Sequence, residues 1–186
     1  MMERATVYRM ISGLTAIFAG LVALLMVFVF PWDNLPYANH SGWKWIWYCA
    51  AAAVLFFNTA LVIAKAKREN GAVFSPGLKM GLRAILPPLF IGFVIGLYQF
   101  RAYNPTLLAW IWMLCYGASL MAKGSFAPRS VSILGGVFIV TGLLYFQQFP
   151  SGENGFVHAN FMMVKTFVIY HLLYGLYVIL IENKRS

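Results

Sequence analysis

The sequence predicts an all-α membrane protein, a polytopic bundle of six transmembrane helices, and two observations carry this prediction. First, 61% of the 186 residues are hydrophobic and only 10% are charged, whereas a soluble domain carries about 25% charged residues. Second, six apolar stretches approach the roughly 20 residues that a helix needs to cross the hydrocarbon core. The length fits a single domain over residues 1–186.

The first three predicted helices are separated by stretches that combine Pro or Gly with polar residues, as loops do. "PWDNLPYANHSG" ends the first, "KAKRENGAVFSPG" follows the second and "RAYNP" follows the third. We predict these helices over residues 10–30, 43–64 and 80–99. No A-x-A-like cleavage site follows the first apolar run, so we expect that run to be retained rather than removed as a signal peptide.

The last three predicted helices are separated by "KGSFAPR" and "QFPSGENG". We predict them over residues 106–122, 131–147 and 159–181. Within the third helix, Pro87 and Pro88 remove backbone donors and favour a kink. Broken helices line binding sites in some transporters, but Pro87 lies near one end of its helix, where a simple kink at the helix entry explains it equally well.

The 14 Lys and Arg residues are distributed unevenly over the two sides of the predicted bundle. Because cytoplasmic loops carry the excess of Lys and Arg, we predict a multi-pass protein of the cell (cytoplasmic or inner) membrane with both termini cytoplasmic. The predicted outer side holds Lys44, Arg101 and Lys165. The predicted inner side holds Arg4, Arg9, Lys65, Lys67, Arg68, Lys79, Arg83, Lys123, Arg129, Lys184 and Arg185.

The formal net charge of +9 is therefore explained by membrane topology. It indicates the lipid bilayer as a partner, since anionic inner-leaflet lipids attract basic segments next to the membrane. It does not indicate nucleic acid, because no predicted loop is long enough for a folded basic domain.

His171 is the main candidate for a functional residue, because ionisable groups inside a membrane are costly and mark function by default. Tyr174 and Gly175 follow it by three and four residues and share its helix face, and Asn58 is a second polar residue inside a predicted span. The functional interpretation is a ligand contact, a proton relay or a haem ligand. The alternative is a neutral histidine that is hydrogen-bonded to a neighbouring helix as part of ordinary packing.

Catalytic machinery is not evident in the sequence. No Asp or Glu falls within a predicted span, and there is no phosphate loop, nucleophile elbow or HExxH motif. Asp33, His40, Glu153 and His158 are suitable metal ligands, but they fall in predicted outer loops without recognisable spacing. We therefore expect no catalytic residues, no metal site and no cofactor.

Tryptophans recur in "SGWKWIWYCA" (41–50) and in "AWIWMLCYGA" (109–118). At the outer end of the second helix we expect Trp43, Trp45 and Trp47 to form a belt at the headgroup level, with Lys44 reaching water. Trp47 precedes Lys65 by 18 residues, whereas Trp112 precedes Lys123 by only 11. We therefore expect Trp112 to lie deeper than Trp47, about 10 Å into the fourth helix, and it becomes a further candidate ligand contact.

The stretches 107–136 and 170–185 resemble a group of uncharacterised bacterial six-helix integral membrane proteins. That group has a "YG…FxPR" turn after its fourth helix, and a histidine followed four residues later by glycine in its sixth. Tyr116, Gly117, Phe126, Pro128 and Arg129 match the first motif, and His171 and Gly175 match the second. The C-terminal "IENKRS" departs from the more basic, glycine-ended tail of the group. The resemblance implies the six-helix topology and supplies no activity.

These observations favour a small, non-enzymatic integral membrane protein that acts as a subunit or partner-binding module, either as a homo-oligomer or with another membrane protein. Glycines such as Gly92 and Gly96, a GxxxG pair, allow close helix contact, either within the chain or between copies. The alternative is a transporter or solute-binding component with a central polar site near His171, Tyr174 and Asn58. A membrane enzyme or redox protein is a third possibility.

Overall fold

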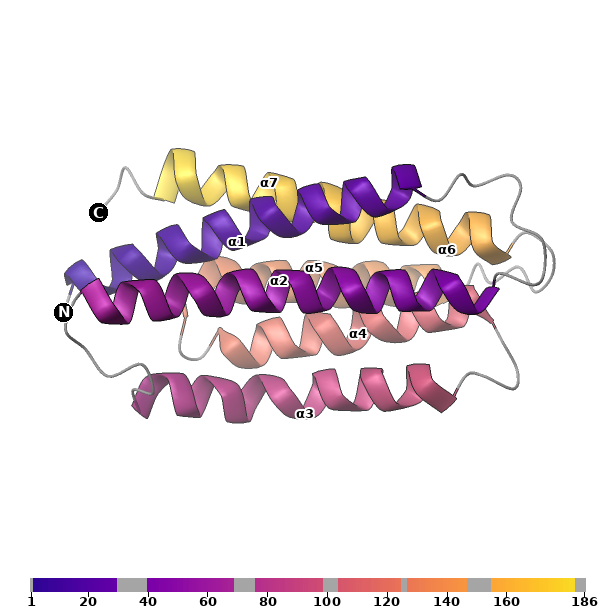
Figure 1. The fold of residues 1–186 in the computed structure, drawn as a ribbon, viewed down its shortest axis with the longest axis horizontal. Helices are drawn as coiled ribbons and strands as arrows, with labels where there is room; N and C mark the ends of the chain where they lie inside the picture. Colours follow the sequence, from indigo (N-terminus) through magenta and orange to yellow (C-terminus); the bar gives the residue numbers. More distant parts are fainter. Residues whose placement is uncertain are drawn as a thin grey trace.

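All six predicted helices are present in the computed structural model. It describes residues 2–29, 40–68, 76–98, 104–124, 127–146 and 155–182, and no strand occurs among them. The prediction of an all-α protein is thus confirmed. Five helices are long and apolar enough to cross a membrane, whereas the apolar helix over Arg129–Tyr145 is shorter. Figure 1 shows the helices side by side along the long axis of the molecule.

The first five helices begin between one and eight residues before their predicted starts. The largest difference is at the N-terminus, where Glu3, Arg4 and Arg9 lie outside the apolar run but still belong to the helix. Helix hydrogen bonding can continue beyond the apolar segment, so hydropathy underestimates the length. The helices are α1 (Met2–Val29), α2 (His40–Arg68), α3 (Pro76–Tyr98), α4 (Pro105–Lys123) and α5 (Arg129–Phe146).

The sixth helix is continuous but changes its hydrogen-bonding pattern along its length. It consists of α6 (Gly155–Met163), the π-helix η2 (Val164–Tyr170), α7 (His171–Tyr177) and the π-helix η3 (Val178–Glu182). π-Helical turns are rare and are often found at functional sites. His171 is the first residue after the first π segment, so the sequence candidate coincides with this irregularity.

The closest helix contact joins α4 and α5 through two glycines. A Cβ atom on Gly135 would lie 2.6 Å from the carbonyl oxygen of Gly117, and one on Gly117 would lie 2.8 Å from that of Gly135. The indole Nε1 of Trp110 also donates a hydrogen bond to the carbonyl of Gly142, at 2.8 Å. Small residues therefore bring the two backbones together, and the buried core beside them includes Leu108, Ala109, Met113, Val131, Leu134, Phe138, Ala159, Met162 and Met163.

Glycines also join α1 to the sixth helix. A Cβ on Gly175 would lie 2.9 Å from the carbonyl oxygen of Gly13, and one on Gly20 would lie 2.7 Å from the side chain of Leu172. The helices α1, α4, α5 and α6–η3 thus form the more tightly packed part of the protein.

The GxxxG pair of α3 packs inside the chain. Gly92 faces Cys115 and Trp112 of α4, and Gly96 faces Tyr48, Leu108 and Trp112. On the same side of α3, Ser119 of α4 donates a hydrogen bond to the carbonyl of Ile85, just before the two prolines, at 3.2 Å. The pair is therefore used within the chain rather than left free for a second copy.

α2 and α3 are the least covered of the helices, with 11% of each apolar window buried. Within the described residues, α3 packs closely against α4 alone, and α2 against α1. The α1–α2 contact includes stacked rings of Phe18 and Phe57, 4.1 Å between centroids. α2 and α3 meet where the Tyr48 hydroxyl donates to the carbonyl of Phe93, at 3.1 Å, and they do not pack backbone to backbone along the rest of their length.

The described basic side chains are concentrated at one end of the bundle, which we call the basic end. There α1 begins, α2 ends, α3 begins, α4 ends and α5 begins (Figure 1). The connections that hold Asp33, Arg101, Phe126 and Glu153 lie outside the described residues. Arg4 and Arg9 belong to α1 at this end, and the basic residues here whose side chains are described are Lys65, Lys67, Arg68, Lys79, Arg83, Lys123 and Arg129.

Candidate functional site

The four residues singled out from the sequence fall in two separate places. His171 and Tyr174 lie together on α7, one turn apart, and both are buried. Asn58 lies on α2 and is linked to their surroundings through α1, as shown below. Trp112 lies in a different cluster, towards the end of the bundle opposite the basic end.

His171 is held inside the bundle between α4 and α5. Its side chain is 3% exposed, and its Nε2 lies 2.7 Å from the hydroxyl oxygen of Tyr116 on α4. Its Nδ1 makes no hydrogen bond within the described part of the chain. In the neutral imidazole Nε2 accepts from the Tyr116 hydroxyl or donates to it, according to the tautomer.

Aromatic rings fill the space around His171. Phe167 stacks on the imidazole at 5.8 Å between centroids, and Phe138 meets it edge-on at 5.5 Å. Tyr116 in turn packs against Phe138 at 5.1 Å and against Phe167 at 5.2 Å. Rings at these distances are in contact with one another. The surroundings of His171 therefore match a packed, hydrogen-bonded core histidine better than an open pocket.

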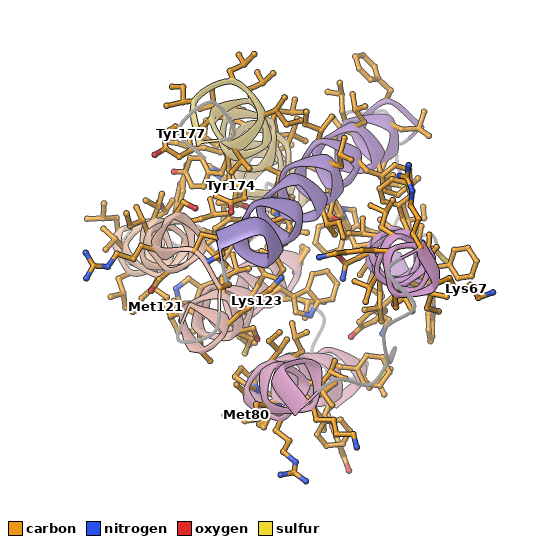
Figure 2. All side chains as sticks on the ribbon, turned by 90° about the vertical axis from the view of Figure 1, so that its left-hand side faces the viewer. Lys67, Met80, Met121, Lys123, Tyr174 and Tyr177 are labelled. Atoms are coloured by element: carbon orange, nitrogen blue, oxygen red, sulfur yellow. The ribbon has the colours of Figure 1, made fainter. Side chains whose placement is uncertain are left out.

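Tyr174 connects α7 to two further helices. Its hydroxyl lies 3.1 Å from the Ser12 hydroxyl of α1 and 3.5 Å from the Ser130 hydroxyl of α5. Figure 2 looks along the bundle from the basic end and shows Tyr174 inside it, whereas Tyr177 lies on the outer flank of the same helix. Tyr174 thus fastens three helices near the basic end.

Asn58 extends this polar contact to α2. Its Oδ1 accepts a hydrogen bond from the Thr15 hydroxyl of α1, at 3.0 Å. Thr15 lies one helical turn after Ser12, so α1 carries the polar contacts of both α2 and α7. We call Ser12, Thr15, Asn58, Tyr116, Ser130, His171 and Tyr174 the polar layer. Interhelical hydrogen bonds of this kind hold membrane bundles together.

Trp112 belongs to an outer aromatic cluster, which we define as Trp43, Trp47, Tyr48, Trp112 and Phe156. Its ring stacks on that of Trp43, with centroids 5.8 Å apart and planes 2° from parallel, and Tyr48 meets it edge-on at 5.1 Å. Its Nε1 donates to the carbonyl of Gly92 at 3.2 Å. The indole is therefore engaged in packing α2, α3 and α4 together.

The expected tryptophan belt is wrong for two of its three members. Trp43 and Trp47 are buried and only Trp45 is exposed, because residues four apart differ by only about 40° around a helix. Trp43 also donates from Nε1 to Oδ1 of Asn160 on α6, at 2.7 Å. Lys44, which we expected to reach water, is fully buried.

Trp112 is also not deeper than Trp47. Its ring contacts both Trp43 and Tyr48, so it lies at the level of the first turns of α2. The distance to the next basic residue is a poor measure of depth here, because α2 continues to Arg68 while α4 ends at Lys123.

Two hydrogen-bond partners were missed in the sequence because a single chain does not reveal which helices are neighbours. Tyr116 was noted only through the resemblance, yet it contacts His171 of the second motif. Asn160 accepts a hydrogen bond from Trp43. Its position at the beginning of an apolar stretch is the sequence signal that could have indicated a buried polar contact.

Metal binding has no support in the described part of the chain, where no three His, Cys, Asp or Glu side chains are grouped closely enough to hold an ion. What the polar layer offers chemically is a Tyr–His hydrogen bond, which can exchange a proton, inside a packed aromatic shell.

Comparisons with protein-family models, with curated proteins and with solved structures found no match for this chain. The resemblance to a group of six-helix membrane proteins therefore stays a prediction. Its motif residues are interpreted from their contacts: Gly117 and Gly175 allow close helix crossings, and Tyr116 bonds to His171.

Proposed function

We propose that the chain crosses the cytoplasmic membrane six times, with both termini on the cytoplasmic side. Five helices are long enough by themselves. The sixth, α5, has 18 residues and therefore spans about 27 Å, close to the roughly 30 Å of the hydrocarbon core. The concentration of Lys and Arg at one end supports the orientation, because that end belongs on the cytoplasmic side.

We propose further that the protein is a non-enzymatic subunit or partner-binding module of the membrane. The observation that carries this proposal is the incomplete packing of α3. Its glycine face lies against α4, while Leu86, Phe90 and Phe93, spaced three and four residues apart on another face, are exposed. We call these three residues the α3 face. It is where a transmembrane helix of another protein or of a second copy could complete the packing that α2 leaves open.

A solute-binding role at His171 has less support. Such a role needs space beside the imidazole, and the rings of Tyr116, Phe138 and Phe167 occupy that space. Asn58, the other polar residue of that hypothesis, is already bonded to Thr15.

Site-specific photocrosslinking tests the partner-binding proposal. A benzoylphenylalanine at Phe90, which is 64% exposed on the α3 face, should give a discrete protein adduct in the native membrane. The matched control is Ile133 on α5, which is 67% exposed and should give no protein adduct. Two results together contradict the proposal. The first is that no adduct forms at Phe90, or that adducts form equally at both positions, and the second is that the purified protein is a monomer without a bound partner.

A further inference from the structure

The outward side of α2 carries a groove that the packing of the bundle does not use. Its volume is about 390 Å³. It is lined by Phe56, Thr59, Ala60, Ile63, Ala64 and Lys67. These residues recur every three or four positions and therefore form one face of the helix.

The length of the groove matches one leaflet of a bilayer. Phe56 and Lys67 are 11 positions apart in the sequence, which corresponds to about 16 Å along a helix. Half of the hydrocarbon core is about 15 Å thick. Phe56 is 78% exposed and stands out at the deeper end, while the small side chains of Ala60 and Ala64 leave the hollow between the larger ones.

The groove is apolar along its length and cationic at its basic end. Its one hydroxyl, that of Thr59, donates to the carbonyl of Leu55 within α2 at 2.8 Å. Lys67 ends the groove, and Figure 2 shows it pointing away from the bundle. Arg68, the last residue of α2, is also exposed. The groove thus changes from apolar to cationic along its length, which is complementary to a lipid with an apolar acyl chain and a negatively charged headgroup.

We infer that the α2 groove binds one anionic phospholipid of the leaflet at the basic end. One acyl chain lies along Phe56 to Ala64, and the phosphate-bearing headgroup contacts Lys67 and Arg68. In the proposed orientation this is the cytoplasmic leaflet. The site is separate from the α3 face and from the polar layer, so it adds a ligand to the protein and does not depend on a partner.

Native mass spectrometry of the full-length protein tests this inference. The protein is released from detergent with phosphatidylglycerol or with phosphatidylcholine of the same acyl chains, and retention of a single lipid is compared. We expect phosphatidylglycerol to be retained preferentially. Lys67→Gln together with Arg68→Gln should reduce that preference about 25-fold, at roughly fivefold for each of the two cations removed.

Two control variants separate this site from general charge attraction. Lys79→Gln with Arg83→Gln removes two exposed cations of α3 at the same end and should leave the preference unchanged. Ala64→Trp fills the groove without touching a cation and should reduce retention of the lipid as well. Equal losses for the two charge variants, or full retention in Ala64→Trp, overturn the inference.

A further arm distinguishes a lipid site from a phosphate site. Glycerol phosphate, which carries the charged headgroup without acyl chains, should not displace the retained phosphatidylglycerol at millimolar concentration. Displacement would show that the cations bind free phosphates and would overturn the assignment of the groove. Because lipid retention is measured without reference to membrane sides or partners, its result is independent of the crosslinking and orientation tests.

Discussion

At the scale of single residues, the hydrogen bond between Tyr116 and His171 joins the main sequence candidate to another helix. His171 is buried and Tyr116 is partly buried, and a buried polar atom that loses its partner keeps its desolvation cost. Polar contacts between transmembrane helices average about 0.6 kcal/mol and reach about 1.7 kcal/mol. The value for this pair should lie in the upper part of that range because the imidazole is 3% exposed and is enclosed by aromatic rings.

Replacement of Tyr116 by Phe should therefore destabilise the protein by about 1–2 kcal/mol. The ring contacts with Phe138 and Phe167 remain, so the loss reports the hydroxyl alone. Reversible unfolding in mixed micelles measures the free energy, and Tyr177→Phe on the outer flank of α7 is the control. Stability equal to that of the parent would show that His171 does not rely on Tyr116.

Single residues also show which parts of the site were predictable from the sequence. His171 stood out because an ionisable residue in an apolar segment is unusual whatever its neighbours are. Its partner did not stand out, because tyrosine is common in membrane helices and the pairing joins residues 55 positions apart. The prediction that Trp43 and Trp47 face the headgroups is wrong for a different reason. Their spacing of four residues places both on one helix face, and that face is buried.

At the scale of helices, glycine positions decide which pairs approach closely. Gly135 and Gly136 are adjacent on α5 but differ completely in their surroundings. A Cβ on Gly135 would meet the Gly117 carbonyl and the Met121 amide nitrogen within 2.8 Å, whereas one on Gly136 would meet nothing within 4 Å. Substitution by alanine at the two positions therefore separates the effect of close packing, at Gly135, from the effect of helix propensity, at Gly136.

Gly135→Ala should destabilise the protein by about 3 kcal/mol, because backbone atoms on α4 cannot move aside as a side chain would. Gly136→Ala should be neutral or stabilising by up to about 1 kcal/mol, the gain in helix propensity. Thermal unfolding of the two variants in the same detergent gives the comparison. Similar unfolding temperatures for both would mean that α4 and α5 are not in contact at Gly117.

Helix existence was predictable from hydropathy, and all six predicted segments are helical. The π-helical turns of the sixth helix were not predictable. Hydropathy indicates which residues prefer lipid, but not which carbonyl accepts the hydrogen bond of each backbone amide. The neighbour relations were also beyond reach: the polar layer depends on α1 lying between α2 and α7, and nothing in the pattern of a single chain orders the helices in space.

At the scale of the whole molecule, the uneven distribution of charge is the feature with the widest consequences. Seven cations with described side chains lie at the basic end, besides Arg4 and Arg9 of α1, while Lys44 and Lys165 lie towards the other. Lys165 is exposed there, with its Nζ 5.5 Å from the ring centroid of Tyr145. The asymmetry supports one orientation in the membrane and argues against insertion in both.

Reporter fusions test that orientation directly. A fluorescent protein that matures only in the cytoplasm should be bright when fused after Ser186, and alkaline phosphatase at the same position should be inactive. Insertion of the same reporters between Gln147 and Gly155 should give the reverse pattern. Active phosphatase after Ser186 would place the basic end on the outer side and contradict the proposed topology.

The basic end also determines how the membrane potential acts on the protein. In a cell whose interior is negative, each positive charge on the cytoplasmic side lies at lower potential energy than on the outer side, by about 2.3 kcal/mol per 100 mV. In an inverted copy, the cations of the basic end would lie on the side of higher electrical potential energy. In the proposed orientation a membrane potential that is negative on the cytoplasmic side therefore favours this arrangement of charges, and the preference weakens when the membrane is de-energised.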